Sequence, residues 1–528
     1  MHKELGGAFL TVSPVGVTLV LADPEAISQV CASRERFPKP PNTGAIINLF
    51  GPNVISTDHA TWRLHRKVTG PVFSEKIHAS VWSEGRRQAQ FMLDSWLPPS
   101  YSGSRSTAPA RGESVVVQTL FDDTLKLGLH VITGSAYACP LSWSGACSNP
   151  PTTSKQPQSY SQSVEQLNNY LMPLFLTPRW LLRAARGGEW GRAWSAYLAL
   201  GGYLEGMLKR EKDRRQWGDD PTPASPSPQQ EQEQDDEGPK ENLLSVLLDS
   251  EEGGDEKERR MTHDEVLGNA FIFMFAGHET TANTTHYALL LLALHQAVQS
   301  RLHSELDALL SLASSQNRDL DYTLDFPHAT YTLAVMQETL RLYTPTSIIN
   351  KSAQGDQRLA FEGKEYVVPG GTRVAVNITG VHSSPKVWGE DVGEFRPERW
   401  LVPVPASASA SASASKEPSR ANTPAPPGTP LHSQQPEPEL KKHTLLKPAR
   451  GSYLPFSEGT RQCSGRKFAS VEFVSVLYTL LSNYRVEILG EREGWGEQRV
   501  RRVLGGRRAG ALTLQVPERV PVRFVRRK

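Results

Sequence analysis

Apolar positions along this chain follow two periods, and each period predicts a different kind of element. Alternating apolar and polar positions in residues 8–21, rich in Val, Leu and Thr, predict a hairpin of two strands. Asp23 followed by Pro24 is typical of a helix start. Helical periodicity predicts amphipathic helices over residues 75–98, 112–136, 164–175, 189–215 and 296–314. The pattern therefore predicts a mainly α fold with small β-sheets, in the α+β class.

The longest predicted helix covers residues 262–295, and its pattern differs from that of the others. Thr262 and Glu265 have the spacing of a capping box at its start. Its body is apolar almost all round, which is typical of a buried helix. Its centre nevertheless holds a glycine, an acid and a run of hydroxyl side chains in residues 277–285. Polar groups at the centre of a buried helix indicate a functional site.

The remaining strand signals lie in the second half of the chain. Residues 357–376 predict short strands joined by turns. Two further runs, 511–516 and 520–524, predict a hairpin that closes the fold at the C-terminus.

Two segments have compositions that predict disordered, low-complexity inserts. Residues 216–241 are rich in Pro, Gln and acidic side chains, and residues 401–445 contain a Ser-Ala repeat followed by Pro-rich sequence. Outside these inserts we expect one domain over residues 1–528.

Composition and charge narrow the classes of partner. The 528 residues have a formal net charge of +2, which does not favour nucleic acid. The four cysteines, Cys31, Cys139, Cys147 and Cys463, show neither paired metal-ligand spacing nor a disulfide-rich pattern. A reducing, cytosol-facing compartment fits best, although Cys139 and Cys147 could pair in an oxidising one. The sequence contains no apolar run of the roughly 18 residues that span a membrane.

One cysteine lies in a loop with distinctive chemistry, residues 456–465. Arg461, Arg466 and the start of the following helix would stabilise a thiolate at Cys463. Glycines on both sides allow a tight turn and close approach to a bulky group. A buried structural cysteine in a Gly-rich turn is the alternative. The loop resembles the haem-binding motif of the cytochrome P-450 family, Phe-x-x-Gly-x-Arg-x-Cys-x-Gly, matched by Phe456, Gly459, Arg461, Cys463 and Gly465.

Further motifs of that family follow in the expected order. Trp62 and Arg66 match Trp-x-x-x-Arg, and the resemblance implies that both reach the haem propionates. A solvated basic helix face is the alternative at this position. Lys351 lies where the family usually has Arg or His on a propionate, and it keeps the charge without the guanidinium fork.

The centre of the predicted 262–295 helix is similar to the family's oxygen-binding helix. Ala276 and Thr280 share one helix face, and Gly277 would permit a local bulge that opens a groove for dioxygen. The resemblance implies that Thr280 hydrogen-bonds the oxygen and that Glu279 connects it to solvent as a proton relay. The alternative is a core helix whose threonines bond the carbonyls four residues earlier.

A last pair of motifs predicts a structural network. Glu338 and Arg341 have helical i, i+3 spacing and precede Arg399, which lies in a sequence similar to the family's Phe-x-Pro-Glu-Arg motif. The resemblance implies one buried ionic network under the cysteine loop, without a catalytic role.

The resemblance implies a haem-thiolate monooxygenase with Cys463 as axial ligand of haem b. It would insert one oxygen atom from O2 into a lipophilic substrate by hydroxylation or epoxidation, with a possible place in fungal secondary metabolism. Electrons would come from NADPH through a flavoprotein reductase. The alternatives are a haem-thiolate isomerase or dehydratase that does not use O2, and a non-catalytic product of a truncated gene.

The same resemblance implies a cellular location, a surface for the reductase and a lining for the substrate pocket. Eukaryotic members normally begin with an anchor, so we expect an N-terminally truncated form of an endoplasmic-reticulum protein that faces the cytosol. Membrane association is expected only with that upstream segment restored. The reductase would dock near Arg63, Lys67, Arg466 and Lys467. The substrate pocket would be lined by residues 40–57, Phe271, Phe275, 346–349 with Ile348, and 511–513 with Leu512.

Overall fold

The computed structural model describes most of the chain. The described ranges are 2–14, 16–40, 47–97, 112–144, 160–185, 187–217, 242–253, 259–404, 443–506, 508–509 and 513–527. Most of the predicted inserts, 216–241 and 401–445, lies outside these ranges, and so do Cys147 and Leu512. Disorder of the inserts and pairing of Cys139 with Cys147 therefore stay predictions.

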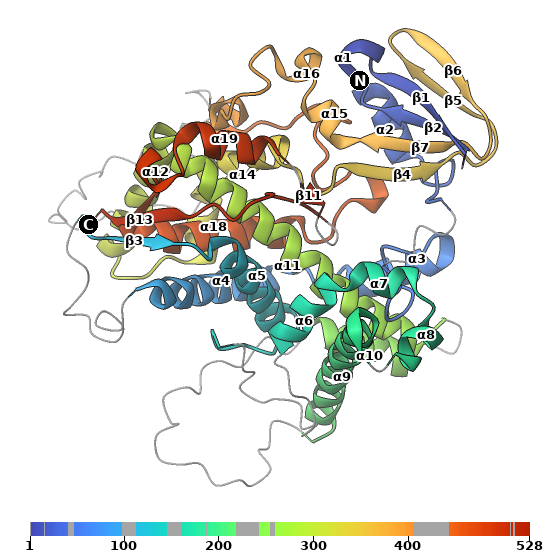
Figure 1. Ribbon diagram of the computed structural model, residues 1–528, viewed down its shortest axis with the longest axis horizontal. Helices are drawn as coiled ribbons and strands as arrows, with labels where there is room; N and C mark the ends of the chain where they lie inside the picture. The colour runs from blue at the N-terminus through green and yellow to red at the C-terminus, as the bar shows by residue number, and fades with distance from the viewer. Residues whose placement is uncertain are drawn as a thin grey trace, which may run out of the picture.

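A single long helix, α11 (His263–Leu294), runs through the middle of the molecule (Figure 1). It begins where the capping box predicts, because Thr262 and Glu265 bond each other's backbone N–H through their side chains. Helix α5 (Leu120–Ala136) packs closely along it. A Cβ at Gly128 of α5 would lie 2.8 Å from the carbonyl oxygen of His278, so only glycine permits this approach.

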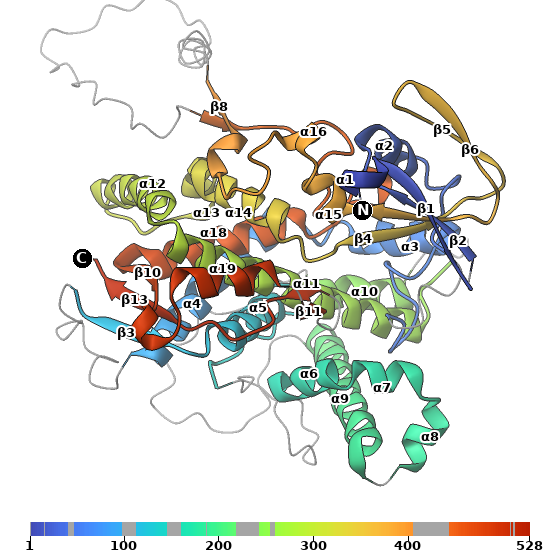
Figure 2. The ribbon, with the colours of Figure 1, turned by 45° about the horizontal axis from the view of Figure 1, so that its top comes forward.

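The other helices surround α11 and α5 (Figures 1 and 2). The longer ones are α3 (His59–Thr69), α4 (Glu75–Trp96), α9 (Gly188–Trp217), α10 (Leu243–Glu252), α12 (Gln296–Ser315), α14 (Thr330–Leu342) and α18 (Arg466–Asn483). The shorter ones are α1 (His2–Leu5), α2 (Pro24–Ala32), α6 (Tyr160–Asn169), α7 (Leu171–Leu176), α8 (Arg179–Ala184), α13 (Tyr322–Asp325), α15 (Ile378–His382), α16 (Pro385–Trp388) and α19 (Glu497–Gly505). The predicted helices at 75–98, 189–215 and 296–314 are thus confirmed, whereas the one predicted at 164–175 is split into α6 and α7.

A four-stranded sheet forms the second layer beside the helices. Its strand order is β1 (Ala8–Ser13), β2 (Gly16–Leu21), β7 (Arg373–Asn377) and β4 (Ile348–Ser352). The predicted hairpin at 8–21 is confirmed as β1 and β2, which are antiparallel with Ala8 opposite Leu21. Strands β5 (Gln357–Phe361) and β6 (Lys364–Val368) form a separate ribbon within the predicted 357–376 region. Lys351 lies on β4 of the four-stranded sheet.

The C-terminal hairpin prediction is wrong. Strand β13 (Val522–Arg526) pairs with β10 (Tyr484–Ile488) and with β3 (Ser114–Val117), while β12 (Leu514–Gln515) pairs with β11 (Arg508–Ala509). Strand β3 also replaces the first residues of the helix predicted at 112–136. Three consecutive valines in β3 favour a strand, and their partner strand is about 400 residues away in sequence, beyond the reach of local pattern.

Strands β8 (Leu401–Pro403) and β9 (His443–Leu445) lie within the two ends of the second predicted insert, 401–445, and pair antiparallel, so the prediction of disorder is wrong for these end residues. Residues 401–403 and 443–445 therefore lie side by side in the structure. Within the described ranges, none of the helices is both long and apolar enough to cross a membrane.

Candidate active site

A cavity of about 400 Å³ lies between the centre of α11 and the cysteine loop. The described residues around it come from α2, α3, α5, α11, α14, α15, α18, β4 and the loops between these elements, including the segment before α18. Among them are the predicted site residues Trp62, Arg66, Ala276, Gly277, Thr280, Lys351, Phe456, Arg461 and Cys463. The structure thus gathers at one cavity residues that are up to 401 positions apart in sequence.

The cysteine loop is held in a fixed turn at the cavity wall. The N–H of Cys463 donates to the carbonyl of Phe456 over 2.8 Å. Gly459 has φ of +76°, and a Cβ there would lie 2.4 Å from the carbonyl oxygen of Cys31, so this position requires glycine. Helix α18 begins three residues after Cys463. The loop therefore aims its thiol into the cavity from the start of a helix.

The electrostatic surroundings of Cys463 act in two directions. Burial raises the pKa of its thiol, whereas the N–H of Gly465 and the charges of Arg66 and Arg466 lower that pKa. A thiolate ligand needs such donors and cations nearby. The donor set fits a soft, thiolate-bound metal, and the described residues contain no group of three or more His, Cys, Asp or Glu that could hold one in another way.

Cations gather along one side of the cavity. Arg461 donates to the carbonyl of Thr57 over 2.8 Å and pairs with Asp58, and Arg66 donates to the hydroxyl of Ser464. Lys351 is 4% exposed and has no ion-pair partner among the described residues. Burial lowers its pKa. The carboxylate of Glu458 also lines the cavity, but it is paired with the exposed Arg450 over 3.0 Å. Asp58 and Glu458 therefore balance only part of the positive charge of these cations.

Lys39 is a further cation at this cavity that the sequence analysis did not single out. Burial, followed by the charges of Arg461 and Lys351, lowers the pKa of Lys39 to about 7, although part of its surface remains accessible. Its ammonium group donates to the carbonyl of Ile55. The only signal in the sequence is its place directly after the Phe37-Pro38 break, which is too weak to identify it.

Trp62 positions two of the arginines. The guanidinium carbons of Arg34 and Arg461 both lie 4.7 Å from its ring centroid. The predicted pairing of Trp62 with Arg66 on one helix face occurs in α3, where both residues reach the cavity wall. A purely solvated basic face, the alternative reading of this helix, does not describe Trp62, which is 7% exposed.

The centre of α11 forms the opposite wall. The Thr280 hydroxyl donates to the carbonyl of Ala276 over 2.9 Å, and the Thr284 hydroxyl donates to the carbonyl of Thr280 over 2.8 Å. The bulge expected at Gly277 is not found, because α11 is α-helical throughout its length. Instead, a Cβ at Gly277 would lie 2.3 Å from the Cδ1 atom of Ile132, so this glycine admits a side chain of α5.

Glu279 lies next to Thr280 in sequence but faces away from the cavity. Its carboxyl group is 1% exposed. Its Oε1 atom accepts hydrogen bonds from the Thr513 hydroxyl over 2.7 Å and from the Gln515 amide over 3.0 Å. Thr513 and Gln515 were not identified as partners of this acid from sequence, since they are more than 230 residues away.

Two predicted pocket residues, Phe271 and Phe275, are corrected by the structure. Both are 1% exposed and belong to the packed core instead of the cavity lining. Their rings stack with centroids 5.0 Å apart, and Phe271 also contacts the ring of Phe50. The cavity-facing side of α11 carries Ile272 and Phe273 instead. The pattern predicted a buried helix correctly, but a helix that is apolar all round gives no sign of which face meets a cavity.

Ile348 is likewise misplaced by one residue. Its side chain is 45% exposed, while Ile349 lines the cavity. Side chains alternate across a strand, so Ile349 and Lys351 of β4 share one face and Ile348 points to the other. Leu512 is outside the described residues, and its role stays a prediction.

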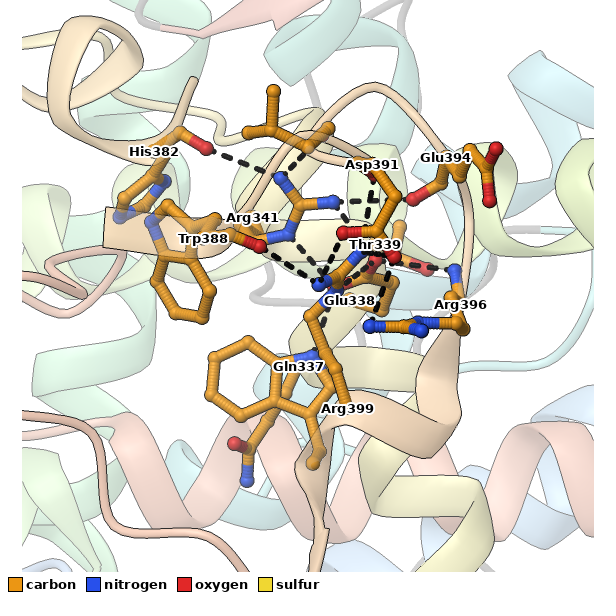
Figure 3. Close-up of polar contacts among 12 residues, drawn as sticks. Gln337, Glu338, Thr339, Arg341, His382, Trp388, Asp391, Glu394, Arg396 and Arg399 are labelled. Atoms are coloured by element: carbon orange, nitrogen blue, oxygen red, sulfur yellow. Dashed lines mark hydrogen bonds and ion pairs between the residues drawn. The ribbon is translucent and has the colours of Figure 1, made fainter. Parts of the chain in front are cut away.

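Glu338, Arg341 and Arg399 form one buried network (Figure 3). The two oxygens of Glu338 accept from Arg341 over 2.8 Å each, and Oε1 also accepts from Arg399 over 2.9 Å. Arg341 donates further to the carbonyls of His382, Val392 and Glu394. None of these three charged residues lines the cavity. The network therefore fixes the chain around α14 without touching the site.

Comparisons with known proteins agree with this geometry. The sequence profile described as Cytochrome P450 matches residues 1–414 and 440–500. A cytochrome P450 monooxygenase of Arthrobotrys oligospora is 29% identical over all of this chain and 85% of its own length. One of Penicillium roqueforti is 28% identical, over all of this chain and 82% of its own length.

A more distant relative and a solved structure extend the comparison. The cytochrome P450 monooxygenase of the phomenoic acid biosynthesis cluster of Leptosphaeria maculans is 24% identical, over 88% of this chain and 73% of its own length. The crystal structure of the cytochrome P450DA heme domain superposes with a TM-score of 0.66 at 18% identity, over all of this chain and 91% of that one. The predicted fold class is thereby confirmed, and the chain belongs to the cytochrome P450 family, as a monooxygenase.

Proposed function

We propose that Cys463 is the axial thiolate ligand of a haem b in this cavity, and that the protein inserts one atom of O2 into a lipophilic substrate by hydroxylation or epoxidation. A haem held by a thiolate supplies the oxygen-activating chemistry when it is bound. The observation that carries the proposal is that the cavity bears a thiol and four cations, Arg66, Arg461, Lys39 and Lys351, against two carboxylates, Asp58 beside Arg461 and Glu458 in the lining.

The cations fit the two propionates of haem b. A buried surplus of positive charge is costly unless an anion accompanies it. Carboxylates placed beside Arg66, Arg461 and the two lysines would supply that charge. The low pKa of Lys39 has the same origin, since burial and neighbouring cations both disfavour its charged form. These residues would therefore hold the propionates, and Trp62 would hold Arg461 in place.

The two side chains at the centre of α11 would handle protons. The hydroxyl of Thr280 reaches the cavity, where it could turn from the Ala276 carbonyl toward a reacting oxygen. Glu279 is the neighbouring acid that could renew its proton. The chain thus has a donor on the cavity side of α11 and a reservoir on the other side.

Apolar side chains dominate the rest of the cavity and support a lipophilic substrate. They include Ile132, Ile272, Phe273, Leu340 and Ile349. Similarity to a monooxygenase of the phomenoic acid cluster supports a place in fungal secondary metabolism. The apolar part of the lining would orient the substrate through shape.

A flavoprotein reductase that takes electrons from NADPH would bind the surface near Cys463. Arg63, Lys67, Arg466 and Lys467 are exposed there. Arg63 is paired with the surface carboxylate of Glu35, and Lys467 with that of Glu75, and an acidic partner would have to displace these carboxylates. Such a patch would raise the rate at which the reductase associates with this protein more than it would raise the affinity of the complex.

Localisation at the cytosolic face of the endoplasmic reticulum is part of the proposal. Family resemblance supports it, and so do exposed apolar side chains on α7 and α8, where Leu176 is 73% and Trp180 is 72% exposed. Apolar side chains of this size partition into a lipid interface.

Oxygen labelling tests the proposed reaction. The purified chain, a fungal NADPH-dependent reductase and a panel of lipophilic probes would be incubated under ¹⁸O2, and products would be analysed by mass spectrometry. We expect one labelled oxygen atom in a product, and none when Cys463→Ala replaces the native chain. A haem-thiolate isomerase or dehydratase would instead convert probes without O2 or NADPH and leave no label.

A further inference from the structure

The carboxyl group of Glu279 is held by the C-terminal segment of the chain. Thr513 and Gln515 both donate to its Oε1 atom. Asn283, one turn further along α11, donates to the Thr513 hydroxyl over 2.8 Å, which leaves that hydroxyl's own proton for Glu279. The described donors therefore form a short chain that fixes where this acid points.

Behind these donors lies a second, larger hollow of about 860 Å³. Helices α5, α6 and α7 and residues 515–519 surround it, and His278 of α11 lies at its floor. Its lining is rich in ionisable side chains, which are Asp122, Asp123, Lys126, Glu165, His278 and Arg519. Asp122, Glu165 and Arg519 are exposed, so the hollow is in contact with solvent at its rim.

Gln515 links the two features. It lines the hollow, and its amide nitrogen bonds the carboxyl group of Glu279, which itself is not part of the lining. One side chain thus lies between a buried acid and a polar hollow whose rim is exposed. The cavity with Thr280 and Cys463 lies on the opposite side of α11.

We propose that protons for the reaction reach Glu279 from this hollow, and that Gln515 and Thr513 are the positioning residues that hold its carboxyl group in the proton-loading orientation. A proton from water in the hollow adds to the Glu279 carboxylate. Rotation of the side chain then brings it to the Thr280 side, where the proton is passed on and the carboxylate is regenerated. The proposal rests on the proposed role of Glu279 and adds the path by which this acid is supplied.

Chemical labelling of carboxyl groups tests the path without measuring activity. The folded holoprotein would be treated with a water-soluble carbodiimide and glycine ethyl ester, and modified peptides would be quantified by mass spectrometry. We expect Asp122 and Glu165 to react quickly and Glu279 slowly. Gln515→Ala should increase the rate at Glu279 several-fold, because it removes the side chain between this acid and the hollow.

Two controls make the labelling result specific. Asn168→Ala also shortens a polar side chain of the hollow but leaves Gln515 in place, so labelling of Glu279 should stay at the native rate. Filling the other cavity with 4-phenylimidazole, which binds haem iron, should not protect Glu279. Protection by this compound, or an unchanged rate in Gln515→Ala, would overturn the proposal.

A second measurement addresses proton transfer itself. Using the probe that the native chain oxidises, turnover would be compared in H2O and D2O for native, Gln515→Leu and Asn168→Leu proteins. Gln515→Leu should be several-fold slower, with a larger solvent isotope effect, whereas Asn168→Leu should match the native protein. A slower Gln515→Leu with an unchanged isotope effect would show a structural role only and would contradict the proposal. If the native chain oxidises no probe, the proposed function fails. The labelling experiment would still show whether Gln515 shields Glu279 from the hollow.

Discussion

Two groups of buried charges differ in how completely they are paired. In the network of Glu338, Arg341 and Arg399, carboxylate oxygens and backbone carbonyls accept the described guanidinium donors (Figure 3). At the cavity, four cations face two described carboxylates, Asp58 and Glu458, and Glu458 is also paired with the exposed Arg450. The first group is complete within the chain, and the second has a surplus of positive charge.

This difference separates structure from function. In a complete network every buried charge has a partner, so the folded protein avoids the cost of an unpaired charge. Removing one member leaves such a charge, and the folded protein then loses stability. A surplus of one sign stores repulsion that an added anion relieves. The sites where a folded chain tolerates such a surplus are therefore candidates for binding an anionic group, which here fits the haem propionates.

The largest effect is expected from breaking the complete network. Glu338→Gln leaves Arg341 buried without a carboxylate and leaves Arg399 with Asp391 alone, so the free energy of unfolding should fall by about 3–5 kcal/mol. Urea unfolding followed by circular dichroism would measure this loss. Glu365→Gln breaks the exposed Arg358–Glu365 pair as a control and should cost less than about 1 kcal/mol. Equal losses in both variants would remove the distinction between buried and exposed pairs.

The cation cluster should respond in the opposite way. Lys351→Met removes one buried cation, so the haem-free chain should be as stable as the native one or more stable. Haem should leave roughly 10- to 100-fold faster, because a charge-assisted hydrogen bond contributes about 1.5–3 kcal/mol. Transfer of haem to apomyoglobin measures the rate, and Lys351→Arg should restore retention. A large loss of stability in haem-free Lys351→Met would show that Lys351 belongs to a paired network after all.

A third kind of buried group, neither paired nor charged, gives the smallest effect. His286 is fully buried, has no hydrogen-bond partner among the described residues, and packs edge-on against Phe121. Burial, and then the charge of Arg519, lower its pKa to about 3. The unfolded chain therefore binds a proton that the folded chain refuses between about pH 6.5 and 3, and stability falls as pH falls through this window.

His286→Leu should remove this sensitivity. Between pH 6.5 and 5 the native chain should lose about 2 kcal/mol through this residue, and the variant should not. Urea unfolding at both pH values measures the difference. The same slope in both proteins would mean that the imidazole is solvated or paired in the folded state.

The sequence predicted the parts of the site that local chemistry determines. The cysteine loop, the capping box of α11 and the i, i+4 pair Trp62 and Arg66 are short-range patterns, and each lies where its pattern indicated. What could not be predicted depends on contacts between distant segments. Partners elsewhere in the chain determine the orientation of Phe271 and Phe275 and the one-residue shift from Ile348 to Ile349. The same holds for the hydrogen bond from Gln515 to Glu279.

The central claim is that the thiol and the surplus cations of one cavity together hold a haem through Cys463. The most direct measurement is the visible spectrum of the purified chain, reduced and exposed to carbon monoxide. We expect the red-shifted Soret band of a thiolate-ligated ferrous–CO complex, and we expect Cys463→Ala to abolish it. A band typical of histidine ligation, or a folded chain that binds no added haem, would contradict it.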